Sequence, residues 1–168
     1  MVQSGEFSTK STEFSTIAKR KVVRIMFLGQ YPHSLDSKNR LFIPSKFREK
    51  LGDTFVIVQS VDHCLRVYPM NAWMQYYEEI NKYPDMQARE IRRFTYSTAT
   101  ENELDSQGRT ILTKDQKAWS FIEKDIYILG VGEYLEIWSK EAWDKSKEKD
   151  INLDLEQLMI ELEKNGRI

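Results

Sequence analysis

Apolar residues fall in short runs along this chain, and clusters of polar turn residues separate the runs. Such spacing is typical of strands joined by tight turns. The pattern appears once in each half of the chain, so the same order of strands is expected twice. In the first half the predicted strands are 27–35, 41–43, 55–58 and 65–68. In the second half one strand is predicted on each side of the turn 105–109, and two further strands at 126–129 and 135–138.

Apolar residues at intervals of three and four predict helices between and after these strands. The predicted helices are 46–51, 71–83, 85–95, 114–119, one from 141 onward, and 153–164. The last of these carries Leu155, Leu158, Met159 and Leu162 on one stripe. A stripe of this kind has to pack on the same domain or on a neighbouring molecule.

One six-residue segment occurs twice. Leu35-Asp36-Ser37-Lys38-Asn39-Arg40 is matched by Leu104-Asp105-Ser106-Gln107-Gly108-Arg109. Asn39 and Gly108 directly precede the arginine, and both residue types tolerate a positive φ that most residues avoid. The two segments are therefore expected to share a backbone shape.

The likeness between the halves continues beyond these turns. Leu65–Tyr68 matches Leu135–Trp138, and Val56-Ile57-Val58 is matched here with Ile126-Tyr127-Ile128. The interval from Asp36 to Asp105 is one residue shorter than the interval from Trp73 to Trp143, so the second copy has gained one residue. A repeat of this period predicts two units that share one core.

The repeated pattern resembles the MraZ family of bacterial transcriptional regulators, which are linked to division and cell-wall genes. The likeness rests on Met26–Tyr31, His33–Asp36, Arg40, Ile43–Arg48, Ala99-Thr100, Glu103–Asp105, Gln107–Arg109, Gly130–Gly132 and Glu136–Trp138. It spans about Met26 to Lys145 and leaves out the start of the chain and the last predicted helix. Short strands in hairpins predict an α+β fold, a small β-barrel with helices packed outside. The resemblance implies that the barrel is AbrB-like, with hairpins swapped between two pseudo-symmetric repeats.

This pattern divides the chain into five parts. They are a leader at 1–25, a first repeat at 26–83, a linking helix at 84–98, a second repeat at 99–150 and a C-terminal helix at 151–168. The leader is rich in Ser and Thr and ends in the basic residues Lys19, Arg20, Lys21 and Arg24. We favour a disordered leader or a cloning remnant, with Met26 as the original start, over a basic arm that touches DNA.

Composition removes several classes of protein. The chain contains no run of about 18 apolar residues, so no membrane span is predicted. A single cysteine, Cys64, excludes an internal disulfide and suits a reducing cytoplasm. Two histidines and one cysteine argue against a structural zinc site, and no grouping of residues predicts catalysis. We therefore expect no enzyme, no cofactor, no membrane and no small-molecule substrate.

The formal net charge of −1 gives no general attraction to nucleic acid, so any DNA contact must come from a local basic surface. Arginine carries a planar fork that suits guanine edges and phosphates. A simple Asp–Arg ion pair within each turn explains the same residues equally well. The resemblance assigns DNA binding to Arg40 and Arg109. The candidate DNA-binding residues are Lys38, Arg40, Gln107, Arg109, Lys46 and Arg48, with Asp36 and Asp105 as positioning residues.

The sequence thus predicts a DNA-binding transcriptional regulator in the cytoplasm, associated with the nucleoid. Two short turns offer few phosphate contacts, so a homo-oligomer would be needed for tight binding. The resemblance implies a ring that binds direct repeats in double-stranded promoter DNA. The alternative is an interaction scaffold whose basic turns bind an acidic protein partner.

Overall fold

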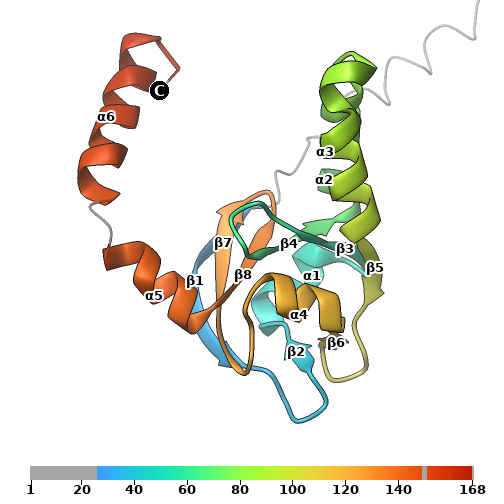
Figure 1. Ribbon diagram of the computed structural model, residues 1–168. Coiled ribbons are helices and arrows are strands. Elements are labelled where there is room, and N and C mark those ends of the chain that lie inside the picture. The colour runs from blue at the N-terminus through green and yellow to red at the C-terminus, as the bar shows by residue number, and fades with distance from the viewer. Residues whose placement is uncertain (1–25, 149–150, 168) are drawn as a thin grey trace, which may run out of the picture.

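The computed structural model describes residues 26–148 and 151–167, and the side chains of 151–153 lie outside that description. The predicted leader, 1–25, also lies outside the described residues. Eight strands form a six-stranded antiparallel sheet and a separate two-stranded ribbon (Figure 1). The strands are β1 (Phe27–Ser34), β2 (Arg40–Phe42), β3 (Thr54–Gln59), β4 (Leu65–Pro69), β5 (Thr100–Glu103), β6 (Arg109–Ile111), β7 (Asp125–Gly132) and β8 (Leu135–Ser139).

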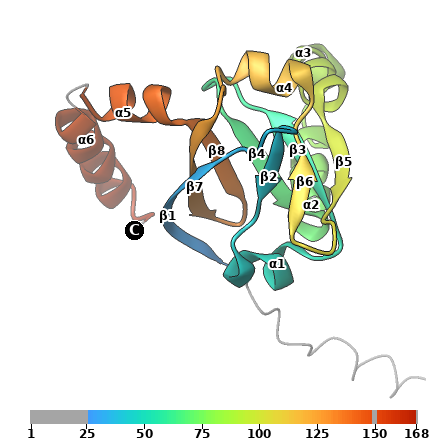
Figure 2. The same ribbon diagram turned by 90° about the horizontal axis from the view of Figure 1, so that it is seen from below.

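Each repeat places a short helix after its ribbon strand and two longer helices after its last strand (Figure 2). The helices are α1 (Ser45–Leu51), α2 (Met70–Asn81), α3 (Asp85–Thr98), α4 (Lys114–Trp119), α5 (Lys140–Glu148) and α6 (Ile151–Lys164). The two short helices start differently. Pro44 precedes α1 without a side-chain cap, whereas Thr113 and Gln116 form a reciprocal capping box at α4.

The two repeats are related by a pseudo-twofold axis, which the strand pairing makes visible. The sheet runs β1-β7-β8-β4-β3-β5, and exchanging the repeats leaves this order unchanged. Equivalent residues face each other where the repeats meet, Leu41 opposite Thr110 in the ribbon and Arg66 opposite Glu136 in the sheet. Each repeat also lends its first strand to the other, because β1 pairs with β7 and β5 pairs with β3.

The pairing corrects one alignment between the repeats. Thr54 pairs with Glu103, and Asp125 pairs with Ser34. Ser34 and Glu103 hold the same place before each turn, so Thr54 corresponds to Asp125, and Ile57 to Ile128. Matching Val56-Ile57-Val58 with Ile126-Tyr127-Ile128 was therefore wrong by one residue, which in a strand exchanges the buried and exposed faces.

One apolar core joins both repeats, as the repeat period predicts. Its largest fully buried side chains come from both halves of the chain, and each strand of the sheet except β5 supplies at least one of them. They are Phe27, Phe47, Phe55, Leu41, Ile43, Leu51, Ile57, Leu65, Ile126, Ile128, Leu135 and Ile137. Neither repeat can bury these residues alone, so the turns of both repeats are fixed to one scaffold.

The α+β class is confirmed, but the predicted closed barrel is not seen. Within the described residues the sheet ends at β1 and β5, and β2 and β6 pair only with each other. These two strands are three residues long and follow directly on the tight turns. The ribbon contacts β1 and β5 through packing and does not extend the ladder. None of the described helices is long and apolar enough to cross a membrane.

Candidate nucleic-acid interface

The first turn, residues 35–40, is held together by one carboxylate. Oδ1 of Asp36 accepts hydrogen bonds from the backbone amides of Lys38 at 2.9 Å and Arg40 at 3.0 Å. Oδ2 of Asp36 accepts from Nε of Arg40 at 2.6 Å. The amide of Asn39 donates to the carbonyl of Asp36 at 3.0 Å. Asp36 thus fixes both the backbone of the turn and the direction of the Arg40 side chain.

The second turn, residues 104–109, repeats this geometry. Oδ1 of Asp105 accepts from the amides of Gln107 and Arg109, both at 2.9 Å, and Oδ2 accepts from Nε of Arg109 at 2.8 Å. The amide of Gly108 donates to the carbonyl of Asp105 at 2.9 Å. The Asp–Arg ion pair that we considered as an alternative is therefore present in both turns. Because it uses Nε alone among the described contacts, the outer edge of each guanidinium stays available.

The backbone amide of each arginine is the main cause of a lowered carboxylate pKa. The amide of Arg40 lowers the pKa of Asp36 below its usual value, and the amide of Arg109 does the same for Asp105. The arginine side chains and the amides of Lys38 and Gln107 add to the effect. Both carboxylates are therefore ionised at neutral pH, where they orient the arginines.

The residue before each arginine has the positive φ that the sequence predicts. Asn39 has φ 58° and Gly108 has φ 78°. The glycine has a second reason to be there, because a Cβ on Gly108 would lie 2.1 Å from Cζ of Arg48. A larger residue at this position would have to displace the flexible end of the Arg48 side chain from the second turn.

The antiparallel ribbon of β2 and β6 brings the two turns together. Arg40 pairs with Ile111, and Phe42 pairs with Arg109. The turns also bond to the strand ends, since the amide of Ile43 donates to the carbonyl of Gly108 at 2.9 Å and that of Leu112 to the carbonyl of Asn39 at 3.3 Å. The side chains of Arg40 and Arg109 are 27% and 24% exposed. Both arginines thus stand on the outer face of one ribbon.

A cationic side chain from the opposite repeat supports each turn. Nζ of Lys117, in α4, donates to Oδ1 of Asn39 at 2.5 Å in the first turn. Arg48, in α1, packs against Gly108 of the second turn, while its Nε donates to the carbonyl of Ile43 at 2.8 Å. Lys117 was absent from the candidate residues. The repeat would have identified it, because Lys117 follows Arg48 at the same interval that separates the two turns.

The remaining predicted residues are placed in different ways. Lys38 and Gln107 are exposed at equivalent points of the two turns. The guanidinium of Arg48 lies 4.5 Å from the ring centroid of Phe42, so its face is already stacked. Nζ of Lys46 lies 3.3 Å from the ring centroid of Tyr31, in β1. Among the described contacts Lys46 touches neither turn, so the structure does not bring it to the other candidates.

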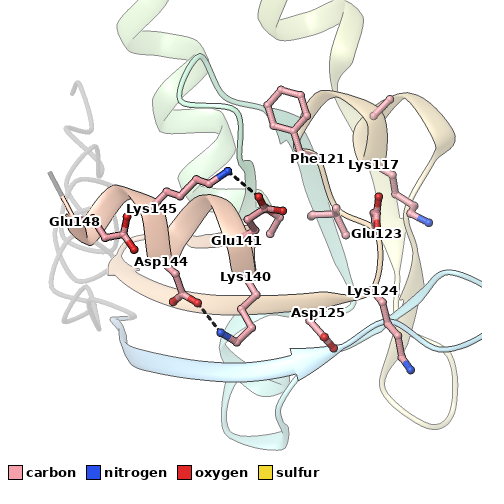
Figure 3. Close-up of a pocket in the computed structure, with 13 residues that line it drawn as sticks. Lys117, Phe121, Glu123, Lys124, Asp125, Lys140, Glu141, Asp144, Lys145 and Glu148 are labelled. Atoms are coloured by element: carbon pink, nitrogen blue, oxygen red, sulfur yellow. Dashed lines mark hydrogen bonds and ion pairs between the residues drawn. The ribbon is translucent and has the colours of Figure 1, made fainter.

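A cleft of about 810 Å³ lies between α5 and the segment that joins α4 to β7 (Figure 3). Two ion pairs within α5 lie along it. Lys140 bonds to Asp144 at 2.5 Å, and Lys145 bonds to Glu141 at 2.7 Å. Within the part of the chain that the structure describes, no group of three or more His, Cys, Asp or Glu residues is arranged to hold a metal ion.

Burial makes the single cysteine chemically quiet. Cys64 is fully buried, and its surroundings raise the pKa of its thiol to about 12. Such a thiol stays protonated at neutral pH and is a poor nucleophile. The best-defined functional arrangement among the described residues therefore remains the pair of turns on the ribbon.

These features define a class of protein, a two-repeat α+β fold that presents two basic turns held by aspartates. The profile of a family described as "MraZ protein, putative antitoxin-like" matches the chain twice, at residues 26–94 and 95–165. A protein of Clostridium tetani named transcriptional regulator MraZ is 41% identical over 143 residues, which covers 84% of this chain and 99% of that protein. The chain belongs to the MraZ family.

Two further relatives carry the same name. The one from Alkaliphilus metalliredigens is 40% identical and also covers 84% of this chain and 99% of its own length. The one from Natranaerobius thermophilus is 44% identical over 74% of this chain and 88% of its own length. The family match reaches residue 165, so the prediction that the likeness ends near Lys145 was wrong. α6 carries no turn motif, and a helical stripe by itself resembles many proteins.

Proposed function

We propose that this protein is a transcriptional regulator that binds double-stranded promoter DNA through its two turns. The observation that carries the proposal is the matched placement of Arg40 and Arg109 on one ribbon, each oriented by an aspartate through Nε. An oriented guanidinium with a free edge is suited to guanine or phosphate, where two parallel hydrogen bonds form. The relatives named transcriptional regulator support this reading.

The charge near the turns supports DNA more strongly than the net charge does. Lys38, Arg40, Arg48 and Lys117 lie at the first turn and the ribbon, whereas the remaining residues carry an excess of acidic groups. Asp36 and Asp105 then act as positioning residues, and Arg48 acts partly through its packing on Gly108. The names of the relatives favour a binding protein over an enzyme.

We further propose that the protein acts as a homo-oligomer, in a ring that engages direct repeats upstream of division and cell-wall genes. One subunit offers only a few cationic groups at its ribbon, and linking several subunits raises affinity without new contacts. The exposed apolar face of α6 supports such assembly, with Leu155, Leu158 and Met159 each at least half exposed. The exchange of first strands between repeats supports a swapped-hairpin relationship. The expected location is the cytoplasm, at the nucleoid.

Binding over a salt series tests the proposal against the scaffold alternative. The full chain is titrated with a promoter duplex that carries direct repeats, with a shuffled duplex of the same composition, and with an acidic polypeptide. A regulator prefers the repeat duplex at every salt concentration, and log K falls linearly with log salt. Equal affinity for both duplexes, or tighter binding to the polypeptide, would reject sequence-specific DNA binding.

A further inference from the structure

The outer face of the β2–β6 ribbon carries two apolar side chains among its arginines. Leu41 is fully buried and Thr110 is 5% exposed, so both point into the core. Successive residues of a strand point to opposite faces, so Arg40, Phe42, Arg109 and Ile111 all point outward. Phe42 is 40% exposed and Ile111 is 56% exposed.

The register pairs each arginine with one of these apolar residues. Arg40 stands directly opposite Ile111, and Arg109 stands directly opposite Phe42. Side chains directly opposite on one face of an antiparallel pair lie about 4.5–5.5 Å apart at Cβ. Because the pseudo-twofold axis passes between Leu41 and Thr110, the face consists of two arginine–apolar pairs that run in opposite directions.

Contacts within the fold account for the apolar residue at Phe42 only in part, and for the one at Ile111 less well. A sheet face that meets only water usually carries polar residues, yet both repeats place an apolar one here. Phe42 contacts the guanidinium of Arg48 at 4.5 Å and the ring of His33 at 6.1 Å between centroids. Ile111 stays more than half exposed. A partner surface with apolar spots beside hydrogen-bond acceptors would suit this face.

The major groove of DNA is such a surface. It admits a two-stranded β-ribbon, guanine offers two acceptors there, and the thymine methyl is its apolar group. Resting on the DNA-binding function proposed above, we infer that Phe42 and Ile111 are specificity-determining residues that contact thymine methyl groups beside the bases reached by Arg109 and Arg40. The opposite directions of the two pairs place the two thymines on opposite strands of the duplex.

The test uses a duplex that the full chain enriches from a random-sequence pool. The duplex is resynthesised with uracil in place of thymine, one strand at a time, which removes methyl groups and leaves the hydrogen-bonding edges unchanged. Each contacted methyl contributes roughly a fourfold gain in affinity. We expect uracil in either strand to weaken binding by about that factor. Equal affinity for the thymine and uracil duplexes, or an enriched site without thymine, overturns the inference.

The variant Ile111→Ala assigns one of these contacts. It should lower affinity for the thymine duplex, and uracil should then have no further effect in one of the two strands. Val61→Ala, a change at another exposed apolar residue that is 75% exposed, serves as the control and should keep the full response to uracil in both strands. Arg40→Ala separates the two proposals. If DNA binding depends on Arg40 but does not respond to uracil, the methyl contacts are rejected and the proposed DNA-binding function stands. Circular dichroism and thermal midpoints confirm that each variant is folded, and an unchanged uracil response in folded Ile111→Ala also overturns the assignment.

Discussion

The two repeats agree closely at their turns and differ at their helical ends. Asp36 and Asp105 make the same set of hydrogen bonds with closely similar lengths, although Lys38 and Asn39 are replaced by Gln107 and Gly108. In contrast, α3 buries Ala88 to 1% exposed, whereas Leu158 in α6 is 56% exposed. One motif has thus been kept twice on one scaffold, while equivalent positions of the helix that follows differ in burial.

The difference at the turns lies in side chains and not in the backbone. The first turn adds the exposed cation Lys38 beside Arg40, and the second adds neutral Gln107 beside Arg109. Each turn also has its own support, a hydrogen bond from Lys117 in the first and the packed guanidinium of Arg48 in the second. The two turns share one backbone geometry but differ in charge, so we expect them to contribute unequally to the affinity for DNA.

Substitutions in the exposed helix α6 test the difference between α3 and α6. Changing Leu158 and Leu162 to Asp should reduce the size or stability of the oligomer, because the apolar face would no longer find an apolar partner. DNA affinity should then fall by about 100-fold or more as linkage between subunits is lost. Light scattering gives the oligomer mass. Ala88→Asp does not serve as a control because Ala88 is buried, so Glu156→Gln on the same helix is the matched variant. An unchanged mass in the double variant rejects α6 as an assembly element.

Substitutions at Gly108 and Asn39, the residues before the two arginines, test how the turns differ. Gly108→Ala should cost about 1–2 kcal/mol of unfolding free energy, because it adds strain at positive φ and displaces Arg48. Asn39→Ala, at the same place in the first turn, adds no contact with Arg48. Measured in the Lys117→Met background, where the hydrogen bond to Asn39 is already absent, it should cost less, about 1 kcal/mol. Urea unfolding of both variants measures the difference. A smaller cost for Gly108→Ala would show that Arg48 does not constrain the second turn.

Removing the support of the first turn should have a moderate effect. Lys117→Met keeps the length of the side chain but loses the hydrogen bond to Asn39, which is worth about 0.5–1.5 kcal/mol. Amide exchange of Asn39 and Arg40 in the DNA-free protein should become faster, while that of Gly108 and Arg109 stays the same. Lys114→Met, on the exposed side of the same helix, is the control. Unchanged exchange in the first turn would show that Lys117 does not support it.

Acid should weaken both turns together. The pKa values of Asp36 and Asp105 are lower in the folded protein than in the unfolded chain, so their contribution is present above the unfolded value of about 3.9 and is lost as pH falls through the folded values. Unfolding free energies measured from pH 7 to pH 2 should show this loss. Asp36→Asn with Asp105→Asn should flatten the acid limb of the curve, and an identical acid limb in this variant contradicts the role of the carboxylates.

The turns were predictable from sequence because their geometry is local. A carboxylate that bonds amides two and four residues ahead, and a positive φ before the arginine, depend on six consecutive residues. The contacts of Lys117 and the outward face of Phe42 and Ile111 depend on pairing across the repeats, which no local pattern fixes. The one-residue error between β3 and β7 has the same origin, since apolar runs such as Phe55–Val58 read alike in either register.

The predicted barrel is not confirmed, and the predicted end of the family likeness near Lys145 was wrong, for related reasons. Whether β2 and β6 join the sheet depends on how the ribbon packs against β1 and β5, and strands of three residues carry little information on this point. α6 was excluded because its sequence shows only a helical period. Its relationship to α3 follows from the order of the elements, in which each follows the helix that bears Trp73 or Trp143.

The most direct test of the two-turn account is the affinity of Arg40→Ala and Arg109→Ala for the same promoter duplex, measured over a salt series. Each variant should lose about 1–3 kcal/mol of binding free energy, with the larger loss for Arg40→Ala, because Lys38 stands beside Arg40 and Gln107 beside Arg109. Both variants should keep the oligomer, and the unfolding midpoint should fall only slightly, because the backbone amide bonds to Asp36 and Asp105 remain. If both folded variants bind the duplex as tightly as the parent does, the turns are not the DNA-binding surface.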